Sequence, residues 1–175
     1  LAHILADKEY VIVGGLAVGS DTCGHRGAME TGYTIAVMPC GLDIVVPSEN
    51  IGLFLQMIDN GSLAISEYPI GHAPTKASYV ERDRLQAGIA DGLIVLETSE
   101  NGGTMHAVKK AAELQRPIGC LSPDMVEQPG NQMLIDQYGA VAINTQDDID
   151  AFVKSLPKRE HSIKGSILVE QSKLF

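Results

Sequence analysis

Residues 10–21 of the chain read Tyr-Val-Ile-Val-Gly-Gly-Leu-Ala-Val-Gly-Ser-Asp. A short β-branched run passes directly into glycines and then into residues that suit the start of a helix. Glycine lets the backbone turn sharply and approach a ligand closely. A helix that follows such a turn offers free N–H groups and a favourable dipole to an anion. The stretch predicts a strand–turn–helix unit, either with a phosphate-type ligand or as a purely structural turn with Asp21 as the N-cap.

The same alternation continues along the chain. Further apolar runs bounded by turn residues predict strands buried on both faces, at residues 34–38, 63–66, 93–96, 117–121 and 140–143. Helical spacing of apolar residues predicts helices at 21–30, 50–60, 80–90, 104–115, 132–138 and 147–156, the last with Thr145 as its N-cap. Strands that alternate with helices predict βαβ units, and so an α/β fold of three layers with a mainly parallel sheet.

Length and pattern together predict one domain. The 175 residues suit a single folded unit, which we place at residues 1–156. Residues 157–175 form a polar linker or tail in which 166–169 are either a final strand or an oligomer contact. The longest irregular stretch covers residues 67–78, and a loop of that length inside a compact domain is often functional.

Composition narrows the class of partner and the compartment. The formal net charge of −9 argues against broad, nonspecific coating of DNA, but it leaves room for a local basic pocket. Three cysteines without a C-x-x-C pair predict small buried thiols and a reducing, cytoplasmic location. Neither a membrane-spanning run nor a signal peptide is predicted, so we expect no membrane partner.

Five blocks in a fixed order resemble one known family. The blocks are Gly14-Gly15-Leu-Ala-x-Gly-x-Asp21-x-x-x-His25-x-x-Ala28, Gly41-Leu-Asp43-Ile-Val-Val-Pro47-Ser-Glu49-Asn50, Ser66-Glu-Tyr-Pro69, Arg82-Asp-Arg84-Leu-Gln-Ala-Gly88 and Gly130-Asn131-x-x-Leu134-Ile135. Together they resemble the DNA-processing protein A (DprA/Smf) family, within the wider Rossmann-like LOG/lysine-decarboxylase-like superfamily. Five ordered blocks are far more specific than one glycine turn.

The resemblance implies both a fold and a function. It implies an extended Rossmann-like fold with a pocket at the carboxyl ends of the strands. It also implies a non-catalytic protein without a cofactor, which binds single-stranded DNA in DNA processing, recombination and natural transformation. A RecA-type recombinase and a second copy, as a homodimer, are the implied protein partners.

Some family features are absent from this sequence. Val18 stands where the family usually has a basic residue, and Asp83 replaces an Asn, so both changes lower the positive potential of the pocket. The family's first strand, with its Val-Gly-Ser-Arg turn, has no counterpart upstream of Leu1. The family's C-terminal winged helix is not visible either.

The candidate binding residues cluster on the glycine turns and on one basic segment. Arg82 and Arg84 suit phosphate, although ion pairs with Glu49, Glu81 or Asp83 are the alternative. His25 either contacts a ligand or is packed behind the turn, and no second ligand at metal spacing accompanies it. The candidates for nucleic-acid or phosphate binding are Gly15, Gly19, Asp21, His25, Lys76, Arg82, Arg84, Gly102, Gly103 and Thr104.

A second glycine turn keeps another class of function open. Gly102, Gly103 and Thr104 resemble part of the LOG-type phosphoribohydrolase motif, but Ala107 and Val108 lie in the region of its downstream glutamate. A general acid or base must reach the scissile bond, and only Glu97 and Glu100 lie nearby. The alternatives are therefore a nucleotide-binding sensor, a LOG-like nucleoside-monophosphate phosphoribohydrolase, or a scaffold protein with a vestigial pocket.

Overall fold

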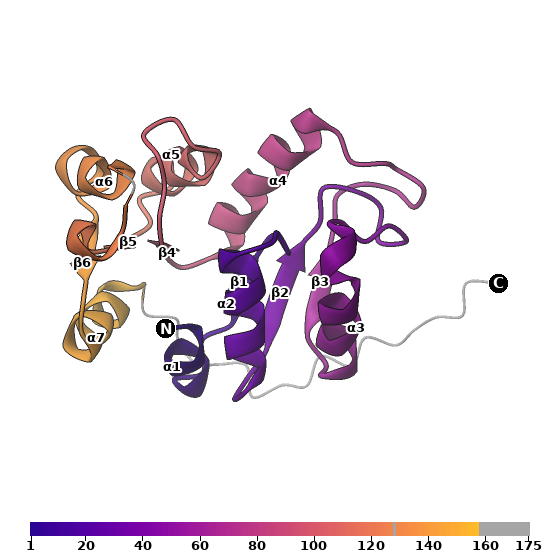
Figure 1. The fold of residues 1–175 in the computed structure, drawn as a ribbon, viewed down its shortest axis with the longest axis horizontal. Helices are drawn as coiled ribbons and strands as arrows, with labels where there is room; N and C mark the ends of the chain where they lie inside the picture. Colours follow the sequence, from indigo (N-terminus) through magenta and orange to yellow (C-terminus); the bar gives the residue numbers. More distant parts are fainter. Residues whose placement is uncertain (128, 158–175) are drawn as a thin grey trace.

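The computed structural model describes residues 1–127 and 129–157 (Figure 1). Its helices and strands alternate along nearly the whole of that length. In chain order they are α1 (Ala2–Asp7), β1 (Ile12–Gly14), α2 (Ser20–Met29), β2 (Thr34–Val37), η1 (Ser48–Asn50), α3 (Ile51–Asp59), β3 (Leu63–Ile65), α4 (Lys76–Ile89), β4 (Leu93–Val95), α5 (Met105–Glu113), β5 (Ile118–Leu121), η2 (Pro123–Met125), α6 (Gly130–Tyr138), β6 (Val141–Ile143) and α7 (Gln146–Ser155).

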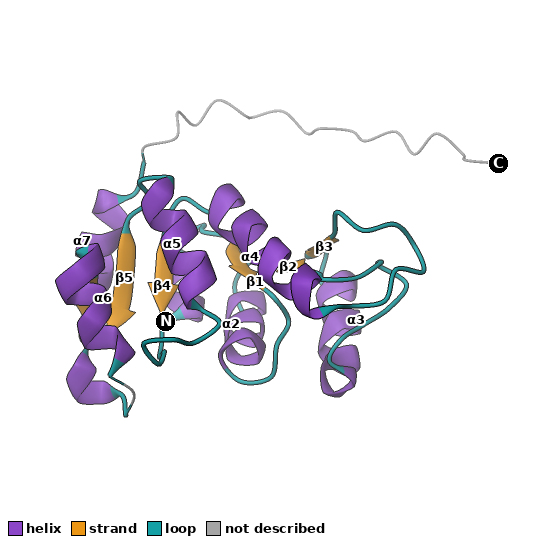
Figure 2. Ribbon diagram, turned by 90° about the horizontal axis from the view of Figure 1, so that it is seen from above, coloured by secondary structure: helices purple, strands orange, loops and turns teal. Residues whose placement is uncertain are grey.

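The strands form two parallel sheets of three strands each, in the orders β1-β2-β3 and β4-β5-β6. Ile35 of β2 lies opposite Val13 of β1 and Leu63 of β3. Figure 2 shows β5, β4, β1, β2 and β3 following one another across the molecule, with helices on both sides. The predicted α/β class is confirmed, and the expected sheet is divided between β1 and β4.

The inner edges of the two sheets are not joined by strand pairing in the part of the chain that the structure describes. The N–H of Ile12 donates to Tyr33 O at 3.4 Å, and that of Leu93 donates to Pro117 O at 2.9 Å, so both point to the outer neighbour. Successive residues of a parallel strand point their N–H groups to opposite sides. The N–H groups of Val13 and Ile94 therefore point into the space between the sheets.

Packing of side chains holds the two sheets together. Each sheet has its own apolar cluster, one around Leu16, Met38 and Met57, the other around Val108 and Leu134. A third cluster joins α1 and α7 to both inner strands, and it contains Leu5, Ile12, Ile94 and Phe152. Burial of apolar surface by these two helices thus takes the place of a continuous hydrogen-bonded sheet.

All predicted strands and helices that fall on the described residues are present, with shifted bounds, and one predicted region lies outside them. All six strands and the six predicted helices occur, and Thr145 caps α7 by accepting from the N–H of Asp148. Helix α4 begins at Lys76 instead of residue 80 because Thr75 and Ser78 form a capping box that ends the long loop at Thr75. Helix α1 was not predicted from the sequence.

The N-cap of α2, the cysteines and residues 166–169 each have a different outcome. Gly19, not Asp21, is the N-cap of α2, so the prediction of an Asp21 cap is wrong. Cys40 and Cys120 are buried as predicted, whereas Cys23 is exposed on α2. The expected strand or contact at residues 166–169 lies outside the described residues.

The open inner edges predict uneven amide protection. We expect the amides of Val13 and Ile94 to exchange with solvent deuterium much faster than those of Ala36 and Cys120, which lie in the central strands β2 and β5. Residue-resolved hydrogen exchange by NMR measures this difference. Equal protection of the four amides would mean that β1 and β4 pair with each other in solution.

Candidate functional site

The first glycine turn connects β1 to α2 at the carboxyl end of the sheet. Gly19 has φ of 101°, a conformation that favours glycine. One oxygen of the Asp21 carboxylate accepts two main-chain hydrogen bonds, from Gly15 N at 2.9 Å and from Ala17 N at 3.1 Å. These two N–H groups are thereby occupied. Asp21 fixes the shape of the turn and at the same time removes two donors that an anion would otherwise use.

Leu16, in the middle of this turn, has a strained backbone conformation that buried contacts stabilise. Leu16 has φ of 64°, although it is not glycine, and its side chain is fully buried. The Nδ2 group of Asn50 donates to Leu16 O at 2.7 Å and to Thr22 Oγ1 at 2.9 Å. A buried side chain and a buried hydrogen bond therefore hold the turn in place, as expected where strain is kept at a site.

Arg82 of α4 lies directly against the glycine turn. Its Nη1 donates to Val37 O at 3.0 Å, and its Nε lies 3.3 Å from Asp83 Oδ1, an ion pair without hydrogen-bond geometry. The guanidinium carbon is 5.6 Å from the centre of the Tyr79 ring. A Cβ atom on Gly15 would lie 1.6 Å from Arg82 Nη1. Glycine at position 15 is therefore what lets the guanidinium reach the end of β2.

His25 is enclosed behind the turn. It is 0% exposed, and its Nδ1 lies 2.7 Å from Thr34 Oγ1, which itself donates to Ile12 O at 2.6 Å. Because the Thr34 proton is used on Ile12, the Nδ1 of His25 is the donor in the other bond. Burial lowers the pKa of His25 below 6.5, the Asp21 carboxylate opposes this, and Arg82 adds to it. Of the two predictions for His25, the structure therefore agrees with a histidine packed behind the turn, because no part of its surface is accessible to a ligand.

The other two predicted cations lie farther out on α4. Arg84 forms an ion pair with Glu67 of the preceding loop. Lys76, the first residue of α4, is exposed and makes no ion pair within the described residues. The hydroxyl of Tyr68 donates to Glu81, and this bond is the main reason that the pKa of Tyr68 rises to about 12. Most positive charge at this edge is thus balanced locally, and Lys76 is the exception.

The second glycine turn connects β4 to α5. A Cβ on Gly103 would meet no atom within 4 Å, so this part of the turn is open. The buried amide of Asn131 fixes the base of the turn by accepting from Thr98 N at 3.2 Å and by donating to Leu96 O at 2.9 Å and Leu121 O at 2.8 Å. Asn131 belongs to a recognisable sequence block, but only the structure gives it this role.

Asp83, the neighbour of Arg82 on α4, is influenced by charges on three helices. Burial raises its pKa, while Arg82 beside it and His106 in the first turn of α5 lower it, and Asp21 raises it. Asp83 thus interacts with charges on α2, α4 and α5. The structure brings Gly15, Asp21 and Arg82 together, whereas the turn with Gly102, Gly103 and Thr104 lies after β4, at the carboxyl end of the other sheet.

Other classes of site are not seen among residues 1–127 and 129–157. No group of three or more His, Cys, Asp or Glu side chains is placed to hold a metal ion there. None of the helices in that part of the chain is long and apolar enough to cross a membrane.

Burial of His25 predicts loss of stability in mild acid. Below pH 6.5 the unfolded chain takes up a proton on His25 that the folded chain refuses, so the free energy of unfolding falls, by at most about 1.4 kcal/mol per pH unit. The fall continues down to the lowered pKa of the folded state. In His25→Gln, which keeps a donor for Thr34, we expect this component to vanish in urea titrations from about pH 7.5 to 5.5. His72→Gln on the surface loop is the control, and an unchanged pH profile in His25→Gln would contradict the assignment.

Because Gly15 contacts Arg82, adding a methyl group at position 15 should lower the unfolding free energy more than adding one at an open glycine. Gly15→Ala forces the guanidinium away from Val37 O, and we expect a loss of about 1–3 kcal/mol in unfolding free energy. Gly103→Ala meets open space and should stay within about 0.5 kcal/mol of the unmodified protein. Chemical denaturation measures both, and equal costs would contradict the role given to Gly15.

Comparison with known proteins identifies the family of this chain. The model of the family DNA recombination-mediator protein A matches residues 1–154. Protein Smf of Synechocystis is 33% identical over 96% of this chain and 42% of its own length. DNA processing protein DprA of Streptococcus pneumoniae is 34% identical over 83% of the chain and 52% of its own length. The chain thus spans about half the length of these curated relatives.

Two solved structures share the fold. DNA processing protein A from Helicobacter pylori, described for its single-stranded DNA binding mode, has a TM-score of 0.81 and 30% identity, covering 90% of this chain and 72% of its own. The Streptococcus pneumoniae DprA structure has a TM-score of 0.78 and 31% identity, covering 90% of this chain and 55% of its own. The match over nearly all described residues leads to one conclusion: the chain belongs to the DNA recombination-mediator protein A family.

Proposed function

We propose that this chain binds single-stranded DNA at the carboxyl edge of its strands and acts in DNA processing and recombination without catalysing a reaction. One observation carries the proposal: the guanidinium of Arg82 lies against Gly15 of the first glycine turn, on a helix that packs against α5, the helix after the second turn. Ligands of open α/β folds bind at this edge, near the point where the strand order reverses. The described single-stranded DNA binding mode of the Helicobacter pylori relative supports the same choice of ligand.

Phosphate would be held mainly at the second turn. The N–H groups of Gly103 and Thr104 have no acceptor within the described part of the chain, whereas Gly102 N donates to Ser99 O. They precede α5, whose N-terminal dipole favours an anion. At the first turn Asp21 occupies two donors, so a phosphate there would depend on the N–H groups of Gly19 and Ser20 and on the outer edge of Arg82.

Tyr79, which belongs to no recognisable sequence motif, would stack against a base. Its side chain is 42% exposed, and the guanidinium of Arg82 lies over its ring. A nucleobase can stack on an aromatic ring of this kind, whatever its sequence. Lys76 lies three residues earlier on the same side of α4, within reach of the adjoining phosphate.

Removal of Lys76 should weaken binding and its dependence on salt. In a titration of fluorescent oligo-dT, Lys76→Ala should lower affinity and reduce the slope of log K against log salt by about 0.7, the value for one phosphate contact on a single strand. Lys110→Ala, which removes a lysine paired with Glu113 on α5, is the matched control and should bind normally. If the unmodified protein fails to bind at about 50 mM salt, the proposal of DNA binding is wrong.

If a base stacks on Tyr79, removing the ring should lower the affinity for single-stranded DNA by the same amount at every salt concentration. Tyr79→Ala should weaken binding by about 1–3 kcal/mol at every salt concentration, whereas Tyr79→Phe should bind nearly as well as the unmodified protein. Tyr33→Ala, at the opposite edge of the sheet and 58% exposed, is the control. Equal effects of Tyr79→Ala and Tyr33→Ala would argue against a base at this position.

The remaining partners follow from the family and belong to the same proposal. We infer a homodimer in the cytoplasm that passes single-stranded DNA to a RecA-type recombinase. The alternative, a nucleotide sensor or LOG-like nucleoside-monophosphate hydrolase, needs a free carboxylate at the second turn. Glu97 Oε1 already accepts from Glu127 N at 3.0 Å, which disfavours Glu97 in that role and leaves Glu100 as the carboxylate to test. Release of free base from AMP by the purified protein would overturn the non-catalytic assignment.

A further inference from the structure

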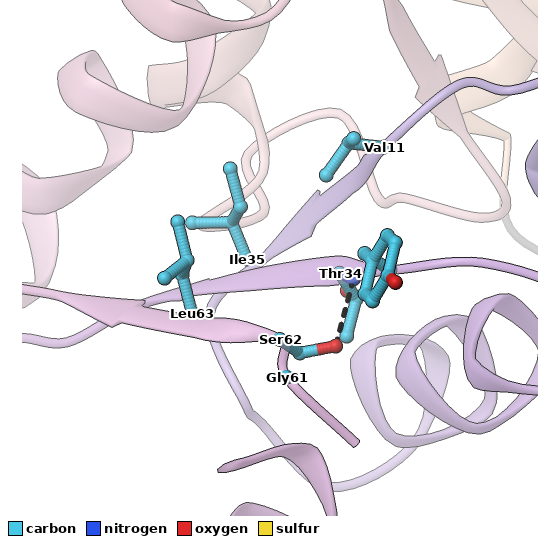
Figure 3. Close-up of a pocket in the computed structure, with 7 residues that line it drawn as sticks. Val11, Thr34, Ile35, Gly61, Ser62 and Leu63 are labelled. Atoms are coloured by element: carbon cyan, nitrogen blue, oxygen red, sulfur yellow. Dashed lines mark hydrogen bonds between the residues drawn. The ribbon is translucent and has the colours of Figure 1, made fainter. Parts of the chain in front are cut away.

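The amino edge of the first sheet carries an apolar hollow, far from the glycine turns. The hollow has a volume of about 310 Å³ and opens among the residues that begin β1, β2 and β3. Val11, Ile35 and Leu63 extend from one face of the sheet toward it (Figure 3). Val11, Tyr33 and Leu63 are 48%, 58% and 56% exposed. Large apolar side chains gathered on one face, in place of scattered ones, indicate a surface that is covered by something.

This face is the one that α2 and α3 leave open. Side chains alternate along β2, and Ala36 points into the cluster that contains Leu53 and Met57 of α3. Ile35 therefore points the other way, as do its register neighbours Val13 and Leu63. Farther along β2 this face is covered, since Val37 is fully buried and α4 contacts the strand, so the open part is the amino-terminal part.

The chain leaves the described fold at this same edge. Leu156 Cδ2 lies 2.5 Å from the place of a Cβ on Gly92, the residue before β4. Parallel strands lie about 4.8 Å apart, so the hollow is on the order of 20 Å away. Residues 158–166 can span about 30 Å when extended. The segment that follows can therefore reach the hollow.

That segment matches the hollow and its rim in chemistry. Residues 167–169 are Ile167, Leu168 and Val169, a purely apolar run after Gly165. The stretch between them and the fold carries three cations, Lys158, Arg159 and Lys164, against the single acid Glu160. The rim of the amino edge carries the exposed acids Asp7, Glu9 and Asp59, where α1 and α3 end, and the exposed cation Lys8, which is paired with Asp150. Helix C-termini add further negative potential there.

We propose that residues 167–169 of this chain cover the apolar face of β1, β2 and β3, while the basic stretch before them crosses the acidic rim. The apolar run shields Val11, Tyr33 and Leu63 from water, and the cations fix its direction of approach. This contact is independent of DNA binding because it lies at the opposite end of the strands from the glycine turns.

Hydrogen exchange on the whole 175-residue chain tests the proposal. In the unmodified protein the amides of residues 166–169 should exchange at least about tenfold more slowly than free peptide. Leu63→Asp should abolish that protection, because it places a charge in the hollow. Val141→Asp changes a similarly exposed side chain, 44% exposed, in the other sheet and should leave the protection intact. Protection of Ile118–Leu121 in β5 reports whether each variant is folded.

A variant in the segment itself provides a second measurement. Leu168→Asp leaves the folded core unchanged and should increase the fluorescence of a hydrophobic dye, an increase that Leu63→Asp in the same chain removes. Three outcomes would overturn the proposal: unprotected amides at 166–169 in the unmodified protein, protection that survives Leu63→Asp, or protection that rises with protein concentration. The last outcome would assign the face to a second copy.

Discussion

The contact between the Arg82 guanidinium and the bare Cα of Gly15 is the constraint on which the site depends. Through it α4 is fixed to the ends of β1 and β2, since the same guanidinium donates to Val37 O. A charge that is only 8% exposed is costly unless it is paired and hydrogen-bonded, and Asp83 and the Val37 carbonyl meet that need. Loss of Asp83 would leave an uncompensated charge in the interior, so the fold and the proposed binding surface depend on the same residues.

Most polar groups at the carboxyl edge of the strands are already paired with other groups of the protein. Asp21 accepts from two N–H groups of the first turn, and Glu67 neutralises Arg84. Asn131 satisfies main-chain groups that follow β4 and end β5. What remains available to a ligand is a small set of N–H groups, one ring and one lysine. A site of this kind favours shape and stacking over charge, which agrees with the overall charge of −9.

Local patterns in the sequence predicted the elements well, and nonlocal contacts explain what they missed. Apolar runs bounded by turn residues located all six strands, and Thr145 was recognisable as a cap. Helix α1 is short, and it is buried by contacts between Leu5 and residues such as Phe152, far along the chain. The early start of α4 depends on a capping box of Thr75 and Ser78, which apolar spacing does not reveal. Arg82 bonds to Val37, and His25 is buried against Thr34. Both contacts join different elements of the fold, so the sequence motifs identified Arg82 and His25 but not their partners.

The division between β1 and β4 has a consequence for how the protein behaves in crowded solution. An unpaired strand edge is a template on which any extended polypeptide can add hydrogen bonds, and natural proteins guard such edges with charge, proline or a bulge. Val13 and Ile94 are apolar and β-branched, so neither edge carries a local guard of this kind. Among the described residues, side chains of α1 and α7 pack in one cluster with Ile12 and Ile94 and so limit access to the seam from one face. If heat or a cavity at Phe152 displaces either helix, the unpaired edges of β1 and β4 become accessible and can start self-association.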